Sequence, residues 1–564
     1  MKHASVFAPA KYQLTHHTRR ATEYHLHEQM KIGETEVKPE AKCRYLGLTI
    51  DTQLRWKPHI NQIQGKANKS IQALSSLAGS TWGMRLKDIR QIYQAIVIPQ
   101  ILYACSAWGI SKSTGDGYTK ELITSLNSIQ AKAARTIAGA FKATSIPALN
   151  VEAHLLPMKQ QLWKAKSLAL ARLLSSNTQL KVRPNQTIEA RNNIRKAPLQ
   201  FLFQGLAKQT VVDLEMLEKI PPTIAAPWWL PPKVSIHKTK EEARTHHEDY
   251  RQRYPDALAI YTDGSGIDGK VGAAAVAPQE GRVKKVFLGN KYTSTVYAAE
   301  LKGIYLALKI AQQELGDSQR EVLIYTDNQA VITIAGKPRS RSGSYLLAEI
   351  IELINEIRPR TRYIEISWIP AHTGIDGNEA ADLAAKEATG WRSNSREQAR
   401  PSAPPRQLYS LKSTLITWIN KHVAEQWAAD WANETKGRKS YEYTPIPGKK
   451  ALEPHREASK SLSSIITQLR TGKIGLNAYL HSRKVPGIDS PNCGCGYRLQ
   501  SIEHVLLYCK KHHQLRRDHL GPGRKTLGEV LSTPKLTLKA AKFMVATRLL
   551  GQFRRPEEEE IDYE

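Results

Sequence analysis

The chain has 564 residues and a formal charge of +30, from 82 basic and 52 acidic side chains. A charge of this size favours a polyanionic partner, most simply nucleic acid, although a merely soluble basic protein has the same composition. Five cysteines in a chain this long exclude a disulfide framework, and the longest apolar stretch, residues 95–108, is too short to span a membrane. We therefore expect an intracellular protein of three or four domains, with no signal peptide, no transmembrane segment and no membrane partner.

Residues 1–215 are predicted to be mainly helical after a short β-like start at residues 44–51. A Pro-rich linker is expected at residues 216–255. Helical periodicity is clear in three segments, residues 60–77, 86–103 and 122–140. Cations on these helices can follow a nucleic-acid backbone or simply form a solvated face. They are Lys66, Lys69, Lys132 and Arg135.

Residues 256–391 are predicted to form one α/β domain. Expected strands lie at residues 257–261, 272–277, 282–288, 321–325 and 363–368. Expected helices lie at residues 295–315, 345–357 and 378–388. Three strands in succession, followed by alternation of helix and strand, indicate a mixed five-stranded sheet with flanking helices.

A second linker, rich in Ser, Pro and Arg, is expected at residues 392–407, and a small helical tail at residues 408–564. The tail is predicted to contain a Trp-bearing helix at residues 411–431 and another helix at residues 461–469.

Two apolar runs of the α/β region end in the same three residues, Tyr-Thr-Asp. The first ends at Asp263 and the second at Asp327. If the two strands are parallel neighbours, the carboxylates lie together and raise each other's pKa unless a cation sits between them. Either Asp alone is also explained as a residue that caps a strand end. The pair therefore indicates a metal site at a sheet edge or two ordinary turns.

Two further acids are predicted to reach the same edge. Glu300 shares a helix face with Ile304 and Leu308, so it points toward the sheet, where an unpaired carboxylate is costly. Asp382 lies on the same face of the last helix as Asn378. Four acids from four elements, Asp263, Glu300, Asp327 and Asp382, provide oxygen ligands only, which suit Mg²⁺ or Mn²⁺ rather than zinc. Two such ions can promote displacement at phosphorus.

The tail contains a cluster with the spacing Cys493-x-Cys495-x8-His504-x4-Cys509. Three thiols and one imidazole can hold a structural Zn²⁺ ion, provided that the helix carrying His504 ends near Cys509. Reduced thiols in a small helical core are the alternative. Basic residues follow directly, and they favour contact with nucleic acid close to this cluster: Lys510, Lys511, Arg516 and Arg517.

Residues 256–391 resemble the type 1 ribonuclease H domain. Four motifs in one order support the resemblance: YTDGS at 261–265, AAEL at 298–301, YTDNQAV at 325–331 and WIPAHTGIDGNEAADLAA at 368–385. One departure is Ala371, where many relatives have glycine before the histidine; it removes no ligand.

The resemblance implies cleavage of the RNA strand of an RNA–DNA hybrid by a two-metal mechanism with Mg²⁺, for which Mn²⁺ can substitute. It gives the four acids the role of metal ligands and His372, in a loop between Pro370 and Gly374, a role in proton transfer or product release. Asn378 and Glu379 would support the site. Contacts to the hybrid would fall to polar groups at strand ends and loops, namely Ser265, Asn328 and Gln329.

The flanks resemble the end of the reverse transcriptase of a non-LTR, LINE-type retrotransposon. The similar segments are residues 7–20, 43–60 and 92–109. This resemblance implies a thumb-like helical remnant over residues 1–215 and a nuclear location. The paired aspartates of a polymerase palm are missing from the sequence, so no reverse transcriptase activity is expected from this chain alone.

Three alternatives remain open at this point. The chain can be a catalytically silent nucleic-acid-binding remnant of a retroelement. It can be a Mg²⁺-dependent nuclease of the same fold that acts on other nucleic acids. It can also be an assembly module that binds RNA through residues 408–564.

Overall fold

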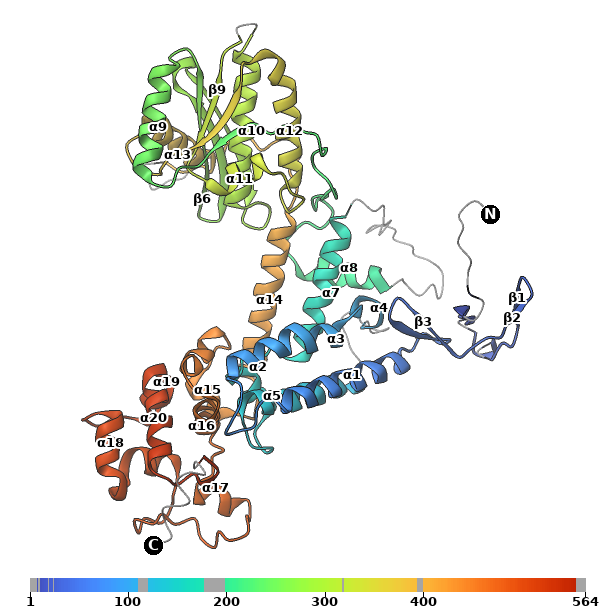
Figure 1. Cartoon of the computed structure of the whole chain (residues 1–564), viewed down its shortest axis with the longest axis vertical. Helices are drawn as coiled ribbons and strands as arrows, with labels where there is room; N and C mark the ends of the chain where they lie inside the picture. Colours follow the sequence, from blue (N-terminus) through green and yellow to red (C-terminus); the bar gives the residue numbers. More distant parts are fainter. Residues whose placement is uncertain are drawn as a thin grey trace. The chain divides into compact units, whose positions relative to one another are not determined.

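The computed structural model describes residues 8, 11–18, 20–23, 25–109, 120–176, 198–316, 319–392 and 399–553. Parts of the motif at residues 7–20 and of the linker at residues 392–407 lie outside the described residues. The chain forms two compact units, one from Met1–Lys166 together with His422–Glu564 and the other from Ser167–Lys421 (Figure 1). Within the described ranges, no helix is both long and apolar enough to cross a membrane.

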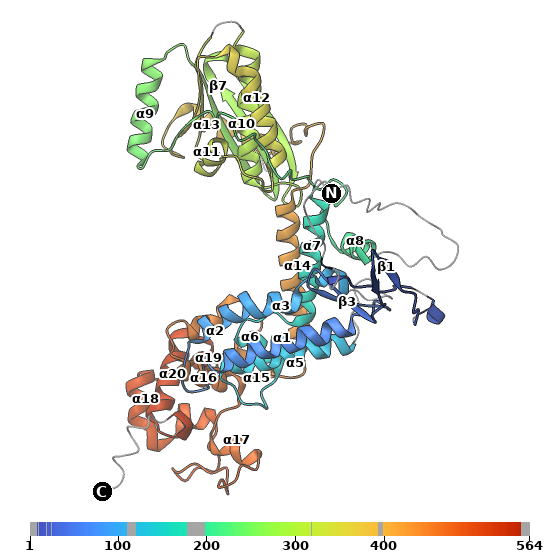
Figure 2. The same cartoon turned by 45° about the vertical axis from the view of Figure 1, so that its right-hand side comes forward.

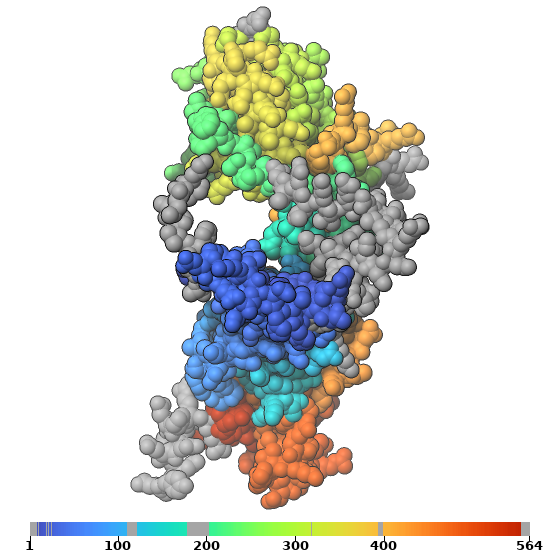
Figure 3. Space-filling view, turned by 90° about the vertical axis from the view of Figure 1, so that its right-hand side faces the viewer, coloured from blue at the N-terminus to red at the C-terminus, as the bar shows by residue number. Residues whose placement is uncertain are grey.

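The N-terminal part of the first unit consists of two β-ribbons, which lie on its surface in dark blue in Figure 3, and a set of packed helices. The ribbons are β1 (Met30–Ile32) with β2 (Thr35–Val37) and β3 (Lys42–Tyr45) with β4 (Leu48–Asp51). The helices are α1 (Lys57–Ser75), α2 (Leu86–Ile92), α3 (Ile98–Leu102), α4 (Cys105–Trp108), α5 (Lys120–Ala138), α6 (Ile146–Glu152) and the first part of α7 (Met158–Leu174), whose residues from Ser167 on belong to the second unit. A π-helical turn, Tyr93–Val97, joins α2 to α3, so the helix expected at residues 86–103 is locally widened.

The C-terminal part of the first unit is also helical. Its elements are α14 (Lys412–Ala432), α15 (Arg438–Tyr443), η6 (Lys449–His455), α16 (Lys460–Thr471), α17 (Asn477–Ser482), η7 (His504–Tyr508), η8 (Lys510–His512), α18 (His513–Leu520), α19 (Leu527–Ser532) and α20 (Pro534–Ala546). Helix α16 packs on α5 and α6, which are more than 300 residues earlier in the chain (Figures 1 and 2). The two ends of the chain therefore share one folded unit.

A buried ion pair joins these two parts. The Arg470 Nε atom lies 2.8 Å from Glu152 Oε2, and neither side chain is more than 2% exposed. The Lys460 ammonium group, also buried, donates hydrogen bonds of 2.7 Å to the carbonyl oxygens of Thr136 and Ile137 at the end of α5. These contacts satisfy charges that would otherwise be costly to bury.

The second unit is built on a mixed six-stranded sheet in the order β5-β10-β9-β6-β7-β8. The strands are β5 (Lys233–Ser235), β6 (Leu258–Ile267), β7 (Lys270–Ala277), β8 (Arg282–Asn290), β9 (Val322–Thr326) and β10 (Ile364–Trp368). β6, β7 and β8 are antiparallel neighbours, whereas β6, β9, β10 and β5 are parallel. The helices are α8 (Pro198–Gln209), α9 (Lys240–Arg253), α10 (Val296–Glu314), α11 (Gln329–Gly336), α12 (Ser344–Ile357) and α13 (Asp376–Ala388).

Alternating residues of β6 are buried on opposite faces of the sheet. Leu258 and Ile260 pack in the core formed with α10 and α12, whereas Ala259 and Tyr261 pack in the core that contains residues of α13. The alanines of α13 allow this helix to lie close to the sheet, and a Cβ atom at Gly272 would lie only 2.6 Å from the Ala385 carbonyl oxygen. The sheet is thus covered on both faces.

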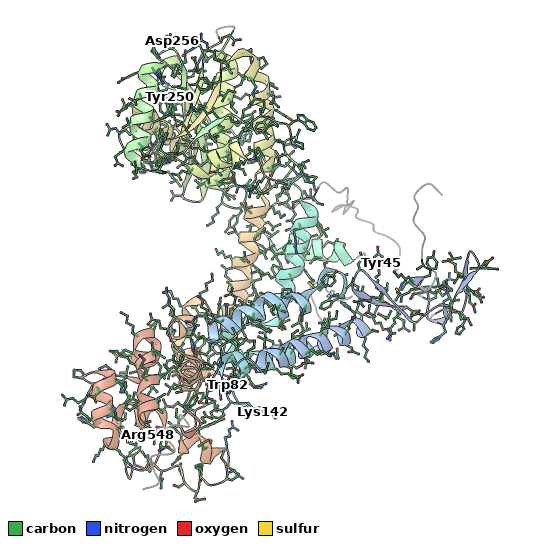
Figure 4. All side chains as sticks on the ribbon, in the orientation of Figure 1. Tyr45, Trp82, Lys142, Tyr250, Asp256 and Arg548 are labelled. Carbon is green, nitrogen blue, oxygen red and sulfur yellow. The ribbon has the colours of Figure 1, made fainter. Side chains whose placement is uncertain are left out.

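The five strands expected within residues 256–391 are all present, as β6 to β10, but the complete sheet has six strands. The additional strand β5 comes from the segment expected to be a linker, and it pairs in parallel with β10. Helix α9 follows it and carries Tyr250, labelled in Figure 4, whose hydroxyl accepts a hydrogen bond of 2.8 Å from Lys233. Helix α11, between β9 and α12, was not expected either.

Candidate active site

The two Tyr-Thr-Asp segments lie side by side in parallel register. Tyr261 pairs with Tyr325 and Thr262 with Thr326, so Asp263 and Asp327 follow at the same edge of the sheet. One carboxylate oxygen from each of Asp263, Glu300 and Asp327 lies within 4.8 Å of the others. Three of the four predicted acids are therefore brought together.

Close packing of α10 on β6 brings Glu300 to this edge. A Cβ atom at Gly264 would lie 2.5 Å from the Glu300 backbone nitrogen, so only glycine allows the helix to approach the strand this closely. Glu300 is 4% exposed and lies on the same buried face as Ile304 and Leu308, as the helix pattern predicted. Its Oε2 atom is buried without a hydrogen-bond partner among the described residues.

The three carboxylates destabilise one another's charge. Burial, together with the charges of Asp327 and Asp382, raises the pKa of Asp263 to about 7. Burial, with the charges of Asp263 and Asp327, raises the pKa of Glu300 to about 9, although a hydrogen bond from Asn328 opposes the rise. Burial also raises the pKa of Asp327, and the nearby His372 opposes this effect.

The fourth predicted acid, Asp382, belongs to an adjoining group with His372 and Glu379, whose ligand atoms lie within 4.8 Å of one another. The Lys386 ammonium group lies 2.6 Å from Asp382 Oδ2, one helical turn along α13. Lys386 also lowers the pKa of Asp263, so this cation partly neutralises the site. The sequence analysis missed Lys386, although its i+4 spacing from Asp382 is a local signal.

The remaining predicted residues surround these two groups. Asn378 is buried with its Oδ1 atom unpartnered among the described residues, and Ser265 is buried on β6. Asn328 caps α11 by accepting a hydrogen bond of 3.1 Å from the Ala330 amide, and Gln329, next to it, is exposed. Trp368 was missed; its indole donates a hydrogen bond of 3.0 Å to the Asp327 carbonyl and holds that segment to β10.

The residues present fit divalent cations. Raised carboxylate pKa values and an unpartnered buried oxygen on Glu300 show that the site lacks positive charge. A hard cation with oxygen ligands would remove both costs. His372, exposed and with a positive φ of 53°, stands beside the carboxylates without being buried among them.

The Cys/His cluster of the tail is also assembled. One ligand atom from each of Cys493, Cys495, His504 and Cys509 lies within 4.8 Å of the others. The Cys493 and Cys509 sulfur atoms are 3.8 Å apart, and Cys495 Sγ is 3.2 Å from His504 Nε2. The π-helical turn η7 ends at Tyr508, so Cys509 lies just beyond it. Four soft ligands at this spacing fit one tetrahedral ion.

The four cations predicted on the N-terminal helices lie on α1 and α5, which pack together. Lys66, Lys69 and Lys132 are exposed, and Lys132 Nζ donates a hydrogen bond of 3.1 Å to Asn68 on α1. Binding of phosphate by these residues stays a prediction.

A mixed sheet with helices on both faces, and with acidic side chains directly after the parallel pairing of the two central strands β6 and β9, defines the second unit as a ribonuclease H-like fold. Residues 255–390 match the family model described as RNase H. This segment is accordingly an RNase H domain.

Similar solved structures each cover about a quarter of the chain. RNase H1 from Halobacterium salinarum NRC-1 is 22% identical, with 23% of this chain and 96% of that chain covered and a TM-score of 0.18. LC11-RNase H1 in complex with an RNA/DNA hybrid is 19% identical, with 23% and 97% covered and a TM-score of 0.19. The protease-reverse transcriptase of prototype foamy virus is 22% identical, with 24% and 21% covered and a TM-score of 0.19.

Proposed function

We propose that the second unit hydrolyses the RNA strand of RNA–DNA hybrids with Mg²⁺, for which Mn²⁺ can substitute. The observation that carries this proposal is the convergence of Asp263, Glu300 and Asp327 in a segment that matches the RNase H family model. Asp382 and His372 adjoin them. Mutually repelling carboxylates at the edge of a sheet suit a reaction in which cations and a phosphodiester arrive together.

The side chains have distinct roles in this proposal. Asp263, Glu300, Asp327 and Asp382 would hold two Mg²⁺ ions, which would supply a more acidic water and neutralise negative charge at phosphorus. His372, near Asp327, would donate a proton from its imidazole to the leaving 3′ oxygen as the bond from that oxygen to phosphorus breaks, or would assist release of the product. Ser265, Asn328 and Gln329 would hydrogen-bond to the hybrid, and Asn378 and Glu379 would orient the loop and helix around His372.

The test is cleavage of an end-labelled RNA–DNA hybrid by the full chain, with Mg²⁺, with Mn²⁺ and with chelator. The variant Asp327→Asn should lose cleavage by at least about a thousandfold, because it removes a ligand charge and almost no volume. Asp256→Asn is the matched control: Asp256 is exposed, lies just before β6 and is labelled in Figure 4. Robust cleavage by Asp327→Asn would overturn the metal assignment.

Two further outcomes distinguish the alternatives. A folded chain that binds the hybrid but does not cut it under any metal condition is a silent remnant. Equal cutting of double-stranded RNA in competition with the hybrid identifies a nuclease of broader substrate range. Cutting of the hybrid RNA strand alone supports the proposal.

We also propose that the chain derives from the C-terminal part of a LINE-type reverse transcriptase. The support is sequence resemblance at residues 7–20, 43–60 and 92–109. The proposed segments are a helical thumb-like remnant (1–215), the RNase H domain (256–391), a second linker (392–407) and the tail (408–564), whereas the segment expected to be a linker (216–255) contributes β5 and α9 to the second unit. Primer extension on an RNA template should give no product, and a fluorescent fusion in cells would test the nuclear location.

Zinc is proposed for the tail, with a structural role. Its support is the proximity of three sulfur atoms and one imidazole nitrogen around Cys495. Elemental analysis of the purified chain should give one zinc per molecule, reduced in Cys495→Ser. Metal-free protein with all five cysteine thiols titratable and with unchanged stability would instead identify the three cysteines of the cluster as reduced core cysteines.

A further inference from the structure

The C-terminal part of the first unit has a hollow that the functions proposed above do not use. Its volume is about 800 Å³, and it is lined by residues of η7, of α18 and of the loop 521–526 that leads into α19. These elements are drawn in red tones in Figure 1. The hollow lies within one folded part of the chain, so its walls are set by local packing.

Positive charge dominates the lining. Arg516, Arg517, Arg524 and Lys525 all contribute, and no Asp or Glu is among the described residues that line the hollow. Arg517 and Arg524 are exposed. Cations gathered in a concave surface repel one another and attract an anion more strongly than the same cations on a convex surface.

Two of these cations are fastened to the backbone. Arg516 donates hydrogen bonds of 2.8 Å to the carbonyl oxygens of Leu506 and Cys509, and Lys525 donates one of 2.8 Å to the Pro522 carbonyl. The hydrogen bonds of Arg516 and Lys525 hold the backbone that lines the hollow, while Arg517 and Arg524 remain exposed to a ligand.

An exposed aromatic ring stands at the edge of the hollow. Tyr508, at the end of η7, is 64% exposed and also lines a second hollow of about 660 Å³. That second hollow carries Lys510 and Tyr497, whose ring stacks on His504 with centroids 4.4 Å apart, and also one carboxylate, Glu503. Exposed aromatic rings beside cations are typical of surfaces on which unpaired bases stack.

We propose that this surface binds single-stranded nucleic acid, with phosphates at Arg517 and Arg524 and a base stacked on Tyr508. The exposed ring favours a single strand over a duplex, whose base faces are covered, and over an acidic protein segment, which has no bases to stack. The site is separate from the carboxylates of the second unit. Its occupation does not depend on hydrolysis.

The test is fluorescence anisotropy with labelled 15-mers of oligouridylate and oligothymidylate on the full chain carrying Asp327→Asn, which prevents cleavage. Arg517→Glu with Arg524→Glu should weaken binding about tenfold or more and lower the slope of log affinity against log salt by about 1.4. Lys535→Glu with Lys539→Glu is the matched control, because both lysines are exposed on α20 and do not line the hollow. The control should change affinity less than threefold.

Tyr508→Ala separates stacking from charge. It should weaken both oligonucleotides about tenfold but leave heparin, a polyanion without bases, unchanged. Three results would each overturn the proposal. The first is an equal loss of oligonucleotide affinity in the Arg517/Arg524 variant and in the Lys535/Lys539 control, and the second is unchanged affinity in Tyr508→Ala. The third is binding of polyglutamate as tightly as of the oligonucleotides. Unchanged circular dichroism of all variants confirms that their fold is intact.

Discussion

Single side chains at the carboxylate site have opposing electrostatic roles. Glu300 and Asp263 are buried among negative charges, whereas His372 is exposed and lowers the pKa of Asp327. Lys386 pairs with Asp382 at 2.6 Å. The buried carboxylates of Asp263 and Glu300 therefore lack a neutralising cation, whereas the His372 imidazole is exposed and can carry a proton.

Substitution of His372 tests the proton carrier. His372→Ala should reduce kcat about a hundredfold without abolishing cleavage, because the carboxylates and their cations remain. KM should change little, since the imidazole is exposed and outside the group of Asp263, Glu300 and Asp327. Complete loss of activity would make His372 as central as the acids.

The raised pKa values predict a pH-dependent stability of the second unit without divalent cations. Folding raises the pKa of Asp263 from 3.8 to about 7 and that of Glu300 from 4.5 to about 9. The folded state holds protons that the unfolded state has released, so stability present at low pH is lost as the pH rises through about 7 and about 9.

Hydrogen-exchange protection factors of the β6 amides, measured in chelator across this range, check this prediction. Glu300→Gln should flatten the decline, because the glutamine carries no charge to lose. Added Mg²⁺ should raise protection most at high pH. A profile that rises with pH in chelator would contradict the assignment of these pKa shifts.

At the scale of elements, one glycine determines how closely a helix approaches the sheet. A Cβ atom at Gly264 would lie 2.5 Å from the Glu300 nitrogen and 2.8 Å from the Ala299 carbonyl carbon. Gly264→Ala should therefore push α10 away from β6 and destabilise the second unit by about 1–3 kcal/mol. Cleavage should fall with it, since Glu300 moves with the helix.

Thermal unfolding and hybrid cleavage measure both effects. Gly65→Ala on α1 is the control, because nothing lies within 4 Å of the added methyl group there and alanine favours a helix interior. Wild-type stability and activity in Gly264→Ala would show that α10 can shift without moving Glu300.

In the second unit, elements with strong apolar periodicity were predictable, whereas β5, α9 and α11, which lack it, were not. β5 has only three residues and depends on β10 for its hydrogen bonds. α9 is almost entirely polar, and Ala243 is its only buried residue. α11 is rich in β-branched residues, which have low helix propensity. It also begins only two residues after Asp327, where the sequence motif favours a turn.

The carboxylate cluster was predictable because the parallel strands β6 and β9 carry the same Tyr-Thr-Asp motif. Lys386 and Trp368 required the fold, since their roles depend on where α13 and β10 lie.

At the scale of the whole molecule, a buried ion pair joins segments that no local pattern connects. Arg470 and Glu152 are 318 residues apart, and both are buried. Arg470→Ala should destabilise the first unit by about 3–5 kcal/mol, because it leaves a buried carboxylate unpaired. Hydrogen exchange should accelerate in α6 and α16, with the β6 amides as an internal reference.

The paired substitution Glu152→Leu with Arg470→Met removes both charges at similar volume. It should recover most of the lost stability. If Arg470→Ala and the paired substitution lower the free energy of unfolding equally, the effect comes from packing and not from the unpaired charge.

The pairing of the two chain ends also sets a delay during synthesis. Glu152 emerges from the ribosome about 300 residues before Arg470, which at 5–20 residues per second is roughly 15–60 s. Throughout that interval the helices around Glu152 lack the surface that α16 will cover, while the whole RNase H domain is made and can fold. The RNase H domain of a nascent chain can therefore fold before the first unit is complete. During this interval the exposed surface of the N-terminal helices is a site at which a ribosome-associated chaperone could bind.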